Sequence, residues 1–147
     1  MKRLLLAVLF AILMVSRVNA QSTLALQEKC GEGAKKFFIE FRGQYRSDSD
    51  LLPDYTSHYN MKLDRCFIHI IVNDYSPSAL TKHGWNGEIV SQYLFDVFGA
   101  GTQSQTLAYG QFKKFLDRTK NPVCKVGDKI CHSEAQFEAL IKPYMEE

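Results

Sequence analysis

Histidine is the side chain best suited to acid–base or metal chemistry near neutral pH, because its imidazole titrates between roughly pH 5 and 8 and readily binds metals. The chain has four, with no His-x-x-x-His spacing: His58, His69, His83 and His132. Folding could bring His58 and His83 together. For His69 we favour a place on a sheet face over a catalytic role. We therefore expect no metal site and no cofactor.

No established catalytic motif is present in the sequence. It lacks a Gly-x-Ser-x-Gly elbow, a His-Glu-x-x-His zinc motif and a Walker loop. The segment from Gly99 to Ser104 imitates the start of a dinucleotide fingerprint but lacks its third glycine. We interpret it as a turn between two antiparallel strands. His132 beside Cys131 would suggest a cysteine-protease pair only if Cys131 were free.

Carboxylates offer a second route to catalysis, because paired acids can hydrolyse glycosides. Four of them flank or lie in expected strands: Asp64, Asp74, Glu88 and Asp96. Charges at strand ends more often discourage edge pairing. A small secreted hydrolase, with a site assembled only in the fold around His69, His58 or Asp96, is therefore an alternative hypothesis.

Aromatic side chains near the most apolar stretch are the best candidates for binding. Amphipathic aromatics on loops are common in interaction surfaces. The candidates are Tyr55, Tyr59, Tyr75 and Trp85. The competing interpretation is that they close the rim of a small core, and we weight it above the binding role.

The N-terminus has the features of an export signal. Basic Lys2 and Arg3 precede an apolar stretch over 4–15, and Val18-Asn19-Ala20 forms a small-residue cleavage site. The apolar stretch is shorter than the roughly 20 residues of a membrane-spanning helix. We predict cleavage after Ala20 and a secreted or periplasmic protein, 21–147, that forms a single domain without a stable membrane anchor.

Charge argues against a nucleic-acid partner. Losing the three basic residues of the leader reduces the 18 basic side chains to 15, against 16 acidic ones, for a net charge of about −1. The remaining basic residues occur singly or in pairs, such as Lys35-Lys36, without a stripe of stacking aromatics. We expect no nucleic-acid binding.

The stretch from Leu63 to Asp74 is the most apolar of the predicted mature chain. Cys66, Ile68, Ile70 and Val72 fall on one face of an extended chain, and Phe67, His69 and Ile71 on the other. Apolar residues on both faces are typical of a central strand covered on two sides. A buried helix could give the same run, but the β-branched residues favour a strand.

The cysteines predict two disulfides, because their number is even in an exported chain, although three pairings are possible. Cys30 lies on the apolar stripe of a helix predicted over 24–41, which would place it against Cys66 of the central strand. A turn at Gly127-Asp128 would place Cys124 opposite Cys131, although a looser loop could carry the same bond. We expect the pairs Cys30–Cys66 and Cys124–Cys131.

The remaining elements follow from local signals. Ser133 and Gln136 form a capping-box pattern before a C-terminal amphipathic helix, in which Pro143 should cause a kink or an end. We predict loops over 43–60 and 76–87, strands over 89–98 and 107–112, and either a strand extension or a helical turn over 113–120. The expected fold is α+β, with a small antiparallel sheet of three to four strands packed by both terminal helices.

We expect a non-catalytic binding protein, such as an inhibitor, an accessory subunit or an envelope factor, with another exported protein as its partner. Besides the hydrolase, the nine phenylalanines outside the leader allow a carrier of an apolar ligand. An empty internal cavity would favour the carrier.

Overall fold

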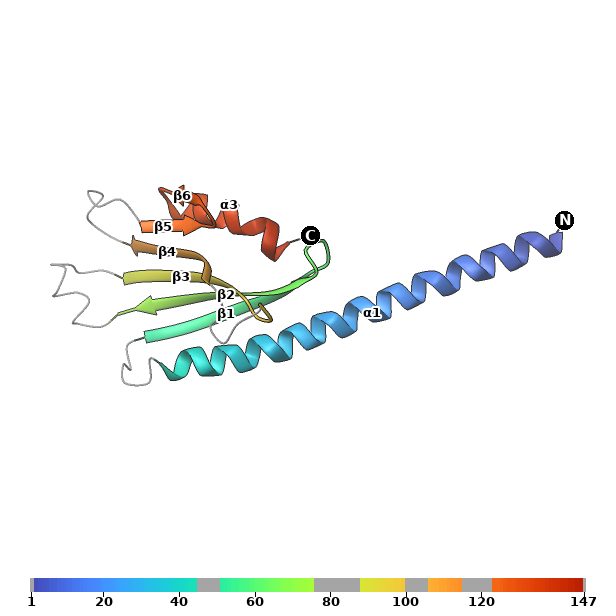
Figure 1. Cartoon of the computed structure of the whole chain (residues 1–147), viewed down its shortest axis with the longest axis horizontal. Helices are drawn as coiled ribbons and strands as arrows, with labels where there is room; N and C mark the ends of the chain where they lie inside the picture. The colour runs from blue at the N-terminus through green and yellow to red at the C-terminus, as the bar shows by residue number, and fades with distance from the viewer. Residues whose placement is uncertain (1, 45–50, 76–87, 100–105, 115–122, 147) are drawn as a thin grey trace.

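The computed structural model of the chain describes the backbone of residues 2–44, 51–75, 88–99, 106–114 and 123–146. Side chains are described over 23–44, 51–75, 89–99, 106–112 and 123–146. These ranges contain two helices and six strands (Figure 1), in the order α1 (Lys2–Gly43), β1 (Leu51–Asn60), β2 (Arg65–Asp74), β3 (Glu88–Asp96), β4 (Thr106–Lys114), β5 (Val123–Val126), β6 (Lys129–Cys131) and α3 (Glu134–Met145).

The strands form one antiparallel sheet in which chain order and spatial order coincide, β1-β2-β3-β4-β5-β6. Tyr55 of β1 pairs with Ile70 of β2, Ile70 with Tyr93 of β3, and Tyr93 with Tyr109 of β4. An irregularity between Leu94 and Phe95 shifts the register of β3 against β4. The α+β class is confirmed.

The expected count of three to four strands is wrong, mainly because 51–60 is a strand and not a loop. β1 pairs with β2 along its whole length, and Pro53 lies opposite Val72. Proline cannot donate to a ladder, but β1 is an edge strand, where proline is tolerated. The short strands β5 and β6 complete the six.

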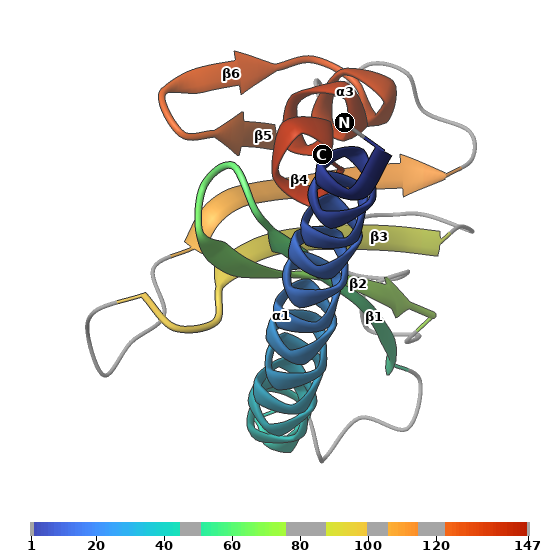
Figure 2. The same ribbon diagram turned by 90° about the vertical axis from the view of Figure 1, so that its right-hand side faces the viewer.

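The prediction for β2 is confirmed, since both of its faces are covered. Ile68, Ile70 and Val72 pack with Ala34 and Phe41 of α1. Phe67 faces the other way and packs with the core that includes Phe137 and Ile141 of α3. Figure 1 shows α1 along the β1–β2 end of the sheet, with its N-terminal part projecting beyond it, and Figure 2 shows α3 beside β4 and β5.

Both predicted disulfides are confirmed. Cys30 of α1 is bonded to Cys66 of β2 across a Cα separation of 5.4 Å. Cys124 and Cys131 lie directly opposite each other in the β5–β6 hairpin and are bonded as well. The turn between them begins at Gly127, whose φ of 56° is in the left-handed region that favours glycine. One bond thus joins α1 to the sheet, and the other closes the hairpin.

Helix α3 begins as its capping box predicts. The Ser133 hydroxyl accepts a hydrogen bond from the backbone N–H of Gln136, and the Gln136 side chain accepts one from the N–H of His132. The helix continues through Pro143 and ends at Met145, two residues later than a stop at the proline. α3 crosses the sheet from β6 to the end of β1, so its last turn lies against Asn60.

Several predictions concern residues outside the described ranges. They include the loop over 76–87 with His83 and Trp85, most of the turn over 99–104, and the segment after Lys114. Lys113 and Lys114 themselves extend β4. Among the residues whose side chains are described, no helix is long and apolar enough to cross a membrane.

Candidate functional site

A chain of three polar side chains joins β2, β3 and α3. Gln92 Nε2 donates to Glu134 Oε1 at 2.8 Å, and Gln92 Oε1 lies 2.9 Å from His69 Nε2. Because a carboxylate can only accept, Glu134 fixes the orientation of the Gln92 amide. The amide oxygen therefore faces His69, whose Nε2 must carry the hydrogen. His69 is 7% exposed and Gln92 2% exposed, so this contact is shielded from water.

A hollow of about 280 Å³ opens beside His69. It is lined by residues of β1, of β2 and of the C-terminal part of α3: Thr56, His69, Glu138, Ala139, Ile141, Lys142, Met145 and Glu146. Thr56 lies directly opposite His69 in the β1–β2 register, and such pairs have Cβ atoms about 5 Å apart. With Nε2 engaged by Gln92, Nδ1 is the imidazole atom left for a ligand. The hollow therefore places a hydroxyl and an imidazole on one wall.

Another histidine on the same strand face, His58, has an unsatisfied atom. Its Nε2 is buried without a hydrogen-bond partner among the described residues. His58 lies between Thr56 and Asn60, in alternation on the face of β1 that meets α3, and it pairs with Phe67. The structure does not join it to His69 by a hydrogen bond. The face of β1 that meets α3 therefore carries polar side chains, whereas a contact that only packed the helix against the sheet would favour apolar ones.

Asn60 connects the β1–β2 turn to the end of α3. Its Oδ1 accepts from the N–H of Leu63 at 3.0 Å, and its Nδ2 donates to the Pro143 oxygen at 2.8 Å. The same Nδ2 lies 3.3 Å from the carbonyl oxygens of Tyr144 and Glu146. Asn60 is 1% exposed. One buried amide therefore holds the turn and the helix end at a fixed spacing.

A groove of about 830 Å³ lies between these two segments, and we call it the α3 groove. It is lined by Asn60, Lys62, Leu63, Lys129, Ala139, Leu140, Lys142, Pro143, Tyr144 and Glu146. The volume falls within the range of about 300–1,000 Å³ typical of ligand sites. Leu63 is 46% exposed, although the leucine is large and apolar. The α3 groove thus combines exposed apolar surface with cationic side chains.

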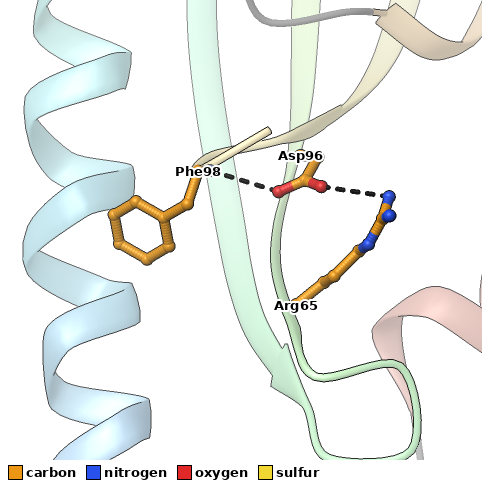
Figure 3. Close-up of polar contacts among 3 residues, drawn as sticks. All are labelled: Arg65, Asp96 and Phe98. Atoms are coloured by element: carbon orange, nitrogen blue, oxygen red, sulfur yellow. Dashed lines mark hydrogen bonds and ion pairs between the residues drawn. The ribbon is translucent and has the colours of Figure 1, made fainter. Parts of the chain in front are cut away.

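Asp96, a carboxylate considered for catalysis, is held in a structural ion pair (Figure 3). Its Oδ2 lies 3.3 Å from a guanidinium nitrogen of Arg65, and its Oδ1 accepts from the N–H of Phe98 at 3.1 Å. Figure 3 shows the Phe98 ring directed towards α1. A Cβ at Gly33 would come within 2.7 Å of that ring, so this glycine allows the close contact. Asp96 therefore fixes the end of β3 against the helix.

The four predicted binding aromatics do not form one surface within the described residues. Tyr55 is half-buried, with its ring 4.4 Å from that of Phe38. Tyr59 is 7% exposed and packs beside the Cys30–Cys66 bond. Tyr75 directly follows β2 and is 47% exposed. Trp85 lies outside the described ranges, so the binding role of the set stays a prediction.

The phenol of Tyr59 forms a hydrogen bond with a carboxylate in the β1–β2 turn. Its hydroxyl donates to Asp64, the carboxylate at the end of the β1–β2 turn. This hydrogen bond, burial and the negative charge of Asp64 together raise the pKa of Tyr59 above its ordinary value near 10. Asp64 itself has a φ of 53°, which aspartate tolerates better than most residues. The pair stabilises the turn on one side of the α3 groove.

The remaining candidates lie apart from both hollows. Asp74 ends β2 at the opposite end of the strand from Arg65, and Glu88 begins β3. His132 is exposed, and its neighbour Cys131 is in a disulfide. Within the described residues, no group of three histidines, cysteines or carboxylates could hold a metal ion.

Comparison of the chain with protein families, curated proteins and solved structures found no match. The function must therefore be inferred from the described side chains.

The residues of the α3 groove were missed from the sequence. Lys62 and Lys129 are isolated lysines, and the spacing of Leu140 and Tyr144 indicates only the apolar face of the C-terminal amphipathic helix. The available signal was Asn60 before the short segment that leads into the apolar stretch, since an asparagine at the end of a strand often bonds to nearby backbone. Nothing local indicated that its partner would be Pro143.

Proposed function

We propose that this chain is an exported, non-catalytic binding protein that captures another exported protein, as an inhibitor, an accessory subunit or an envelope factor. The observation that carries the proposal is the α3 groove, an open groove of about 830 Å³ with apolar and cationic walls. Exposed apolar surface rimmed by polar groups is characteristic of interaction sites.

The groove has a fixed shape, which favours binding. Asn60 bonds the turn to the last turn of α3, and the Ser133 cap fixes the first turn of the same helix. A site that is ordered before binding avoids much of the entropy cost of association. Leu63, Leu140 and Tyr144 supply apolar contacts for a partner side chain.

Export is supported by the composition of the N-terminus and by the two disulfides. Structural disulfides persist in secreted and periplasmic proteins and are rare in a reducing cytosol. Tyr75, with nearly half of its surface exposed, and Trp85 remain proposed contributors to a wider binding surface.

The proposal is tested by capture from the exported fraction of the native host. The bait is the full chain, expressed with its leader and purified after export with both disulfides formed. Leu63→Glu should abolish capture of a stoichiometric partner, because it places a charge on the apolar wall. Leu52→Glu is the matched control, since Leu52 is 58% exposed at the far end of β1. Equal capture by both variants would refute a role for the groove.

A second candidate is the small hydrolase, favoured by the hollow beside His69. The Thr56 hydroxyl would attack an ester carbonyl and pass its proton to His69 Nδ1, which would give that proton to the departing alcohol. Water, deprotonated by the same imidazole, would then hydrolyse the acyl-threonine and restore the hydroxyl. Gln92 and Glu134 would act as positioning residues. The test is hydrolysis of p-nitrophenyl acetate by the pure protein. A rate equal to that of free imidazole, unchanged in Thr56→Val, would eliminate this candidate.

The carrier of an apolar ligand is the third candidate, and the described hollows give it the least support. Both the α3 groove and the hollow beside His69 open to solvent, whereas an apolar cargo requires an enclosed cavity.

A further inference from the structure

We infer that the α3 groove recognises an acidic peptide segment of the partner, with an apolar side chain inserted between Leu63 and Tyr144. This inference rests on the proposed function and adds the chemistry of what the groove takes. It follows from the balance of charge around the groove, from the state of the α3 C-terminus and from the open shape of the site.

The described residues that line the groove carry an excess of positive charge. They include three lysines, Lys62, Lys129 and Lys142, and one carboxylate, Glu146. Lys142 Nζ lies 3.3 Å from Glu146 Oε2, so those two charges largely compensate each other. Lys62 and Lys129 have no ion-pair partner among the described side chains. Two cations from different elements are thus available to an acidic ligand.

The C-terminus of a helix normally repels anions, because its last carbonyl groups carry partial negative charge. In this groove the two hydrogens of Asn60 Nδ2 are shared among three of them: the Pro143 oxygen at 2.8 Å and those of Tyr144 and Glu146 at 3.3 Å. The N–H of Glu146 also satisfies the carbonyl of Lys142. Since these oxygens are engaged, the helix end opposes a carboxylate less than a free terminus would.

The open shape favours a peptide over a small anionic amphiphile. Small ligands bury most of their surface in an enclosed pocket, whereas this groove opens along one side of α3. A peptide can place one apolar residue against Leu63 and Tyr144 while flanking carboxylates meet Lys62 and Lys129. Long-range attraction of this kind also increases the rate of association.

The inference is tested by fluorescence anisotropy with two labelled hexapeptides, Asp-Leu-Asp-Glu-Leu-Asp and its basic counterpart Lys-Leu-Lys-Lys-Leu-Lys. We expect the exported protein to bind the acidic peptide at least ten-fold more tightly at low salt, and this preference should shrink in 0.5 M NaCl as the charges are screened. Equal affinity for the two peptides, or no binding of either, would overturn the inference.

Two double variants separate the groove from net charge. Lys62→Glu with Lys129→Glu should weaken binding of the acidic peptide at least ten-fold. Lys35→Glu with Lys36→Glu makes the same change of charge on the exposed side of α1 and should leave affinity within about two-fold. Equal losses in both variants would overturn the inference. So would displacement of the peptide by one equivalent of laurate, which would assign the groove to amphiphiles.

The outcome also separates the inference from the proposed function. If neither peptide binds but Leu63→Glu still abolishes partner capture, the groove is a binding site for a partner that is not acidic. If Leu63→Glu leaves capture intact, the proposed function itself fails.

Discussion

Asn60 Nδ2 lies 2.8 Å from the carbonyl oxygen of Pro143, a residue 83 positions further along the chain. The opposite side of the same amide accepts from the N–H of Leu63 at 3.0 Å. One side chain therefore ends β1, closes the β1–β2 turn and caps α3. The two walls of the α3 groove depend on this single buried residue.

Replacing Asn60 should destabilise the protein and loosen the groove. Asn60→Ala removes a donor and an acceptor from buried backbone partners, and we expect it to lower the free energy of unfolding by about 1–3 kcal/mol. Asn60→Asp should lower it further at pH 7, because a carboxylate cannot donate to the Pro143 oxygen. Urea denaturation measures both changes.

The control for these variants is Asn73→Ala, at the far end of β2. No side-chain hydrogen bond joins Asn73 to the described residues, so its replacement should change stability by less than about 0.5 kcal/mol. An equal effect of Asn60→Ala and Asn73→Ala would contradict the role given to Asn60.

The two disulfides should contribute unequally. Cys30–Cys66 spans 36 residues and Cys124–Cys131 spans 7. On the chain-entropy relation, replacing both cysteines of the first pair by serine should cost about 4 kcal/mol, against about 2.5 kcal/mol for the second. Denaturation of the two double variants tests this order, and a larger loss from the hairpin pair would contradict it.

The polar chain through Gln92 should behave as one unit. Gln92→Leu leaves His69 Nε2 buried without its acceptor, and we expect a loss of about 1–3 kcal/mol. In a His69→Phe background the same substitution should cost less, because the buried donor is already gone. Thermal denaturation of the two single variants and the double variant gives the coupling free energy between Gln92 and His69. Strict additivity would show that Gln92 and His69 do not interact.

Alkaline pH should destabilise the protein through Tyr59. Because folding raises the pKa of this phenol, the unfolded chain ionises first. The stabilisation is complete below about pH 10 and is lost as pH rises above that value. Tyr59→Phe should lose stability less steeply than the unaltered protein does as pH rises above about 10. Identical slopes, measured by denaturation at each pH, would exclude the Tyr59–Asp64 contact.

Features with local signals were predictable from the sequence. The apolar residues on both faces of β2 identified a strand covered on two sides, and the Ser133–Gln136 pair identified the start of α3. The spacing of apolar residues in the N-terminal helix placed Cys30 against Cys66. Each signal lies within a single helix or strand. In these segments, tertiary packing favours the same structure as the local sequence does.

β1 was missed because its local composition contradicts its structure. Pro53 and the polar residues around it indicate a loop, but an edge strand needs few ladder donors and can expose one face. The alternating exposure of 51–56 is the pattern that a half-covered strand produces. Only pairing with β2, which the sequence does not display, decides between strand and loop.

The sites depend on contacts between distant residues, so the sequence could not show them. His69 meets Gln92 through the register of β2 and β3, and Gln92 meets Glu134 only once α3 lies across the sheet. The α3 groove likewise lies between the β1–β2 turn and the end of α3, which are distant in sequence and are joined by the bond from Asn60 to Pro143. An isolated lysine such as Lys62 becomes part of a candidate binding site only through the residues that folding places beside it.

The most direct test of the central claim is to map binding residue by residue on the ¹⁵N-labelled exported protein. The acidic peptide would be titrated in while the backbone amide signals are followed by NMR. We predict that the largest shifts fall on Lys62, Leu63, Lys129, Leu140 and Tyr144, which line the α3 groove. Shifts concentrated instead on α1, or on the start of β5 around Val123, would contradict the assignment of the groove as the binding site.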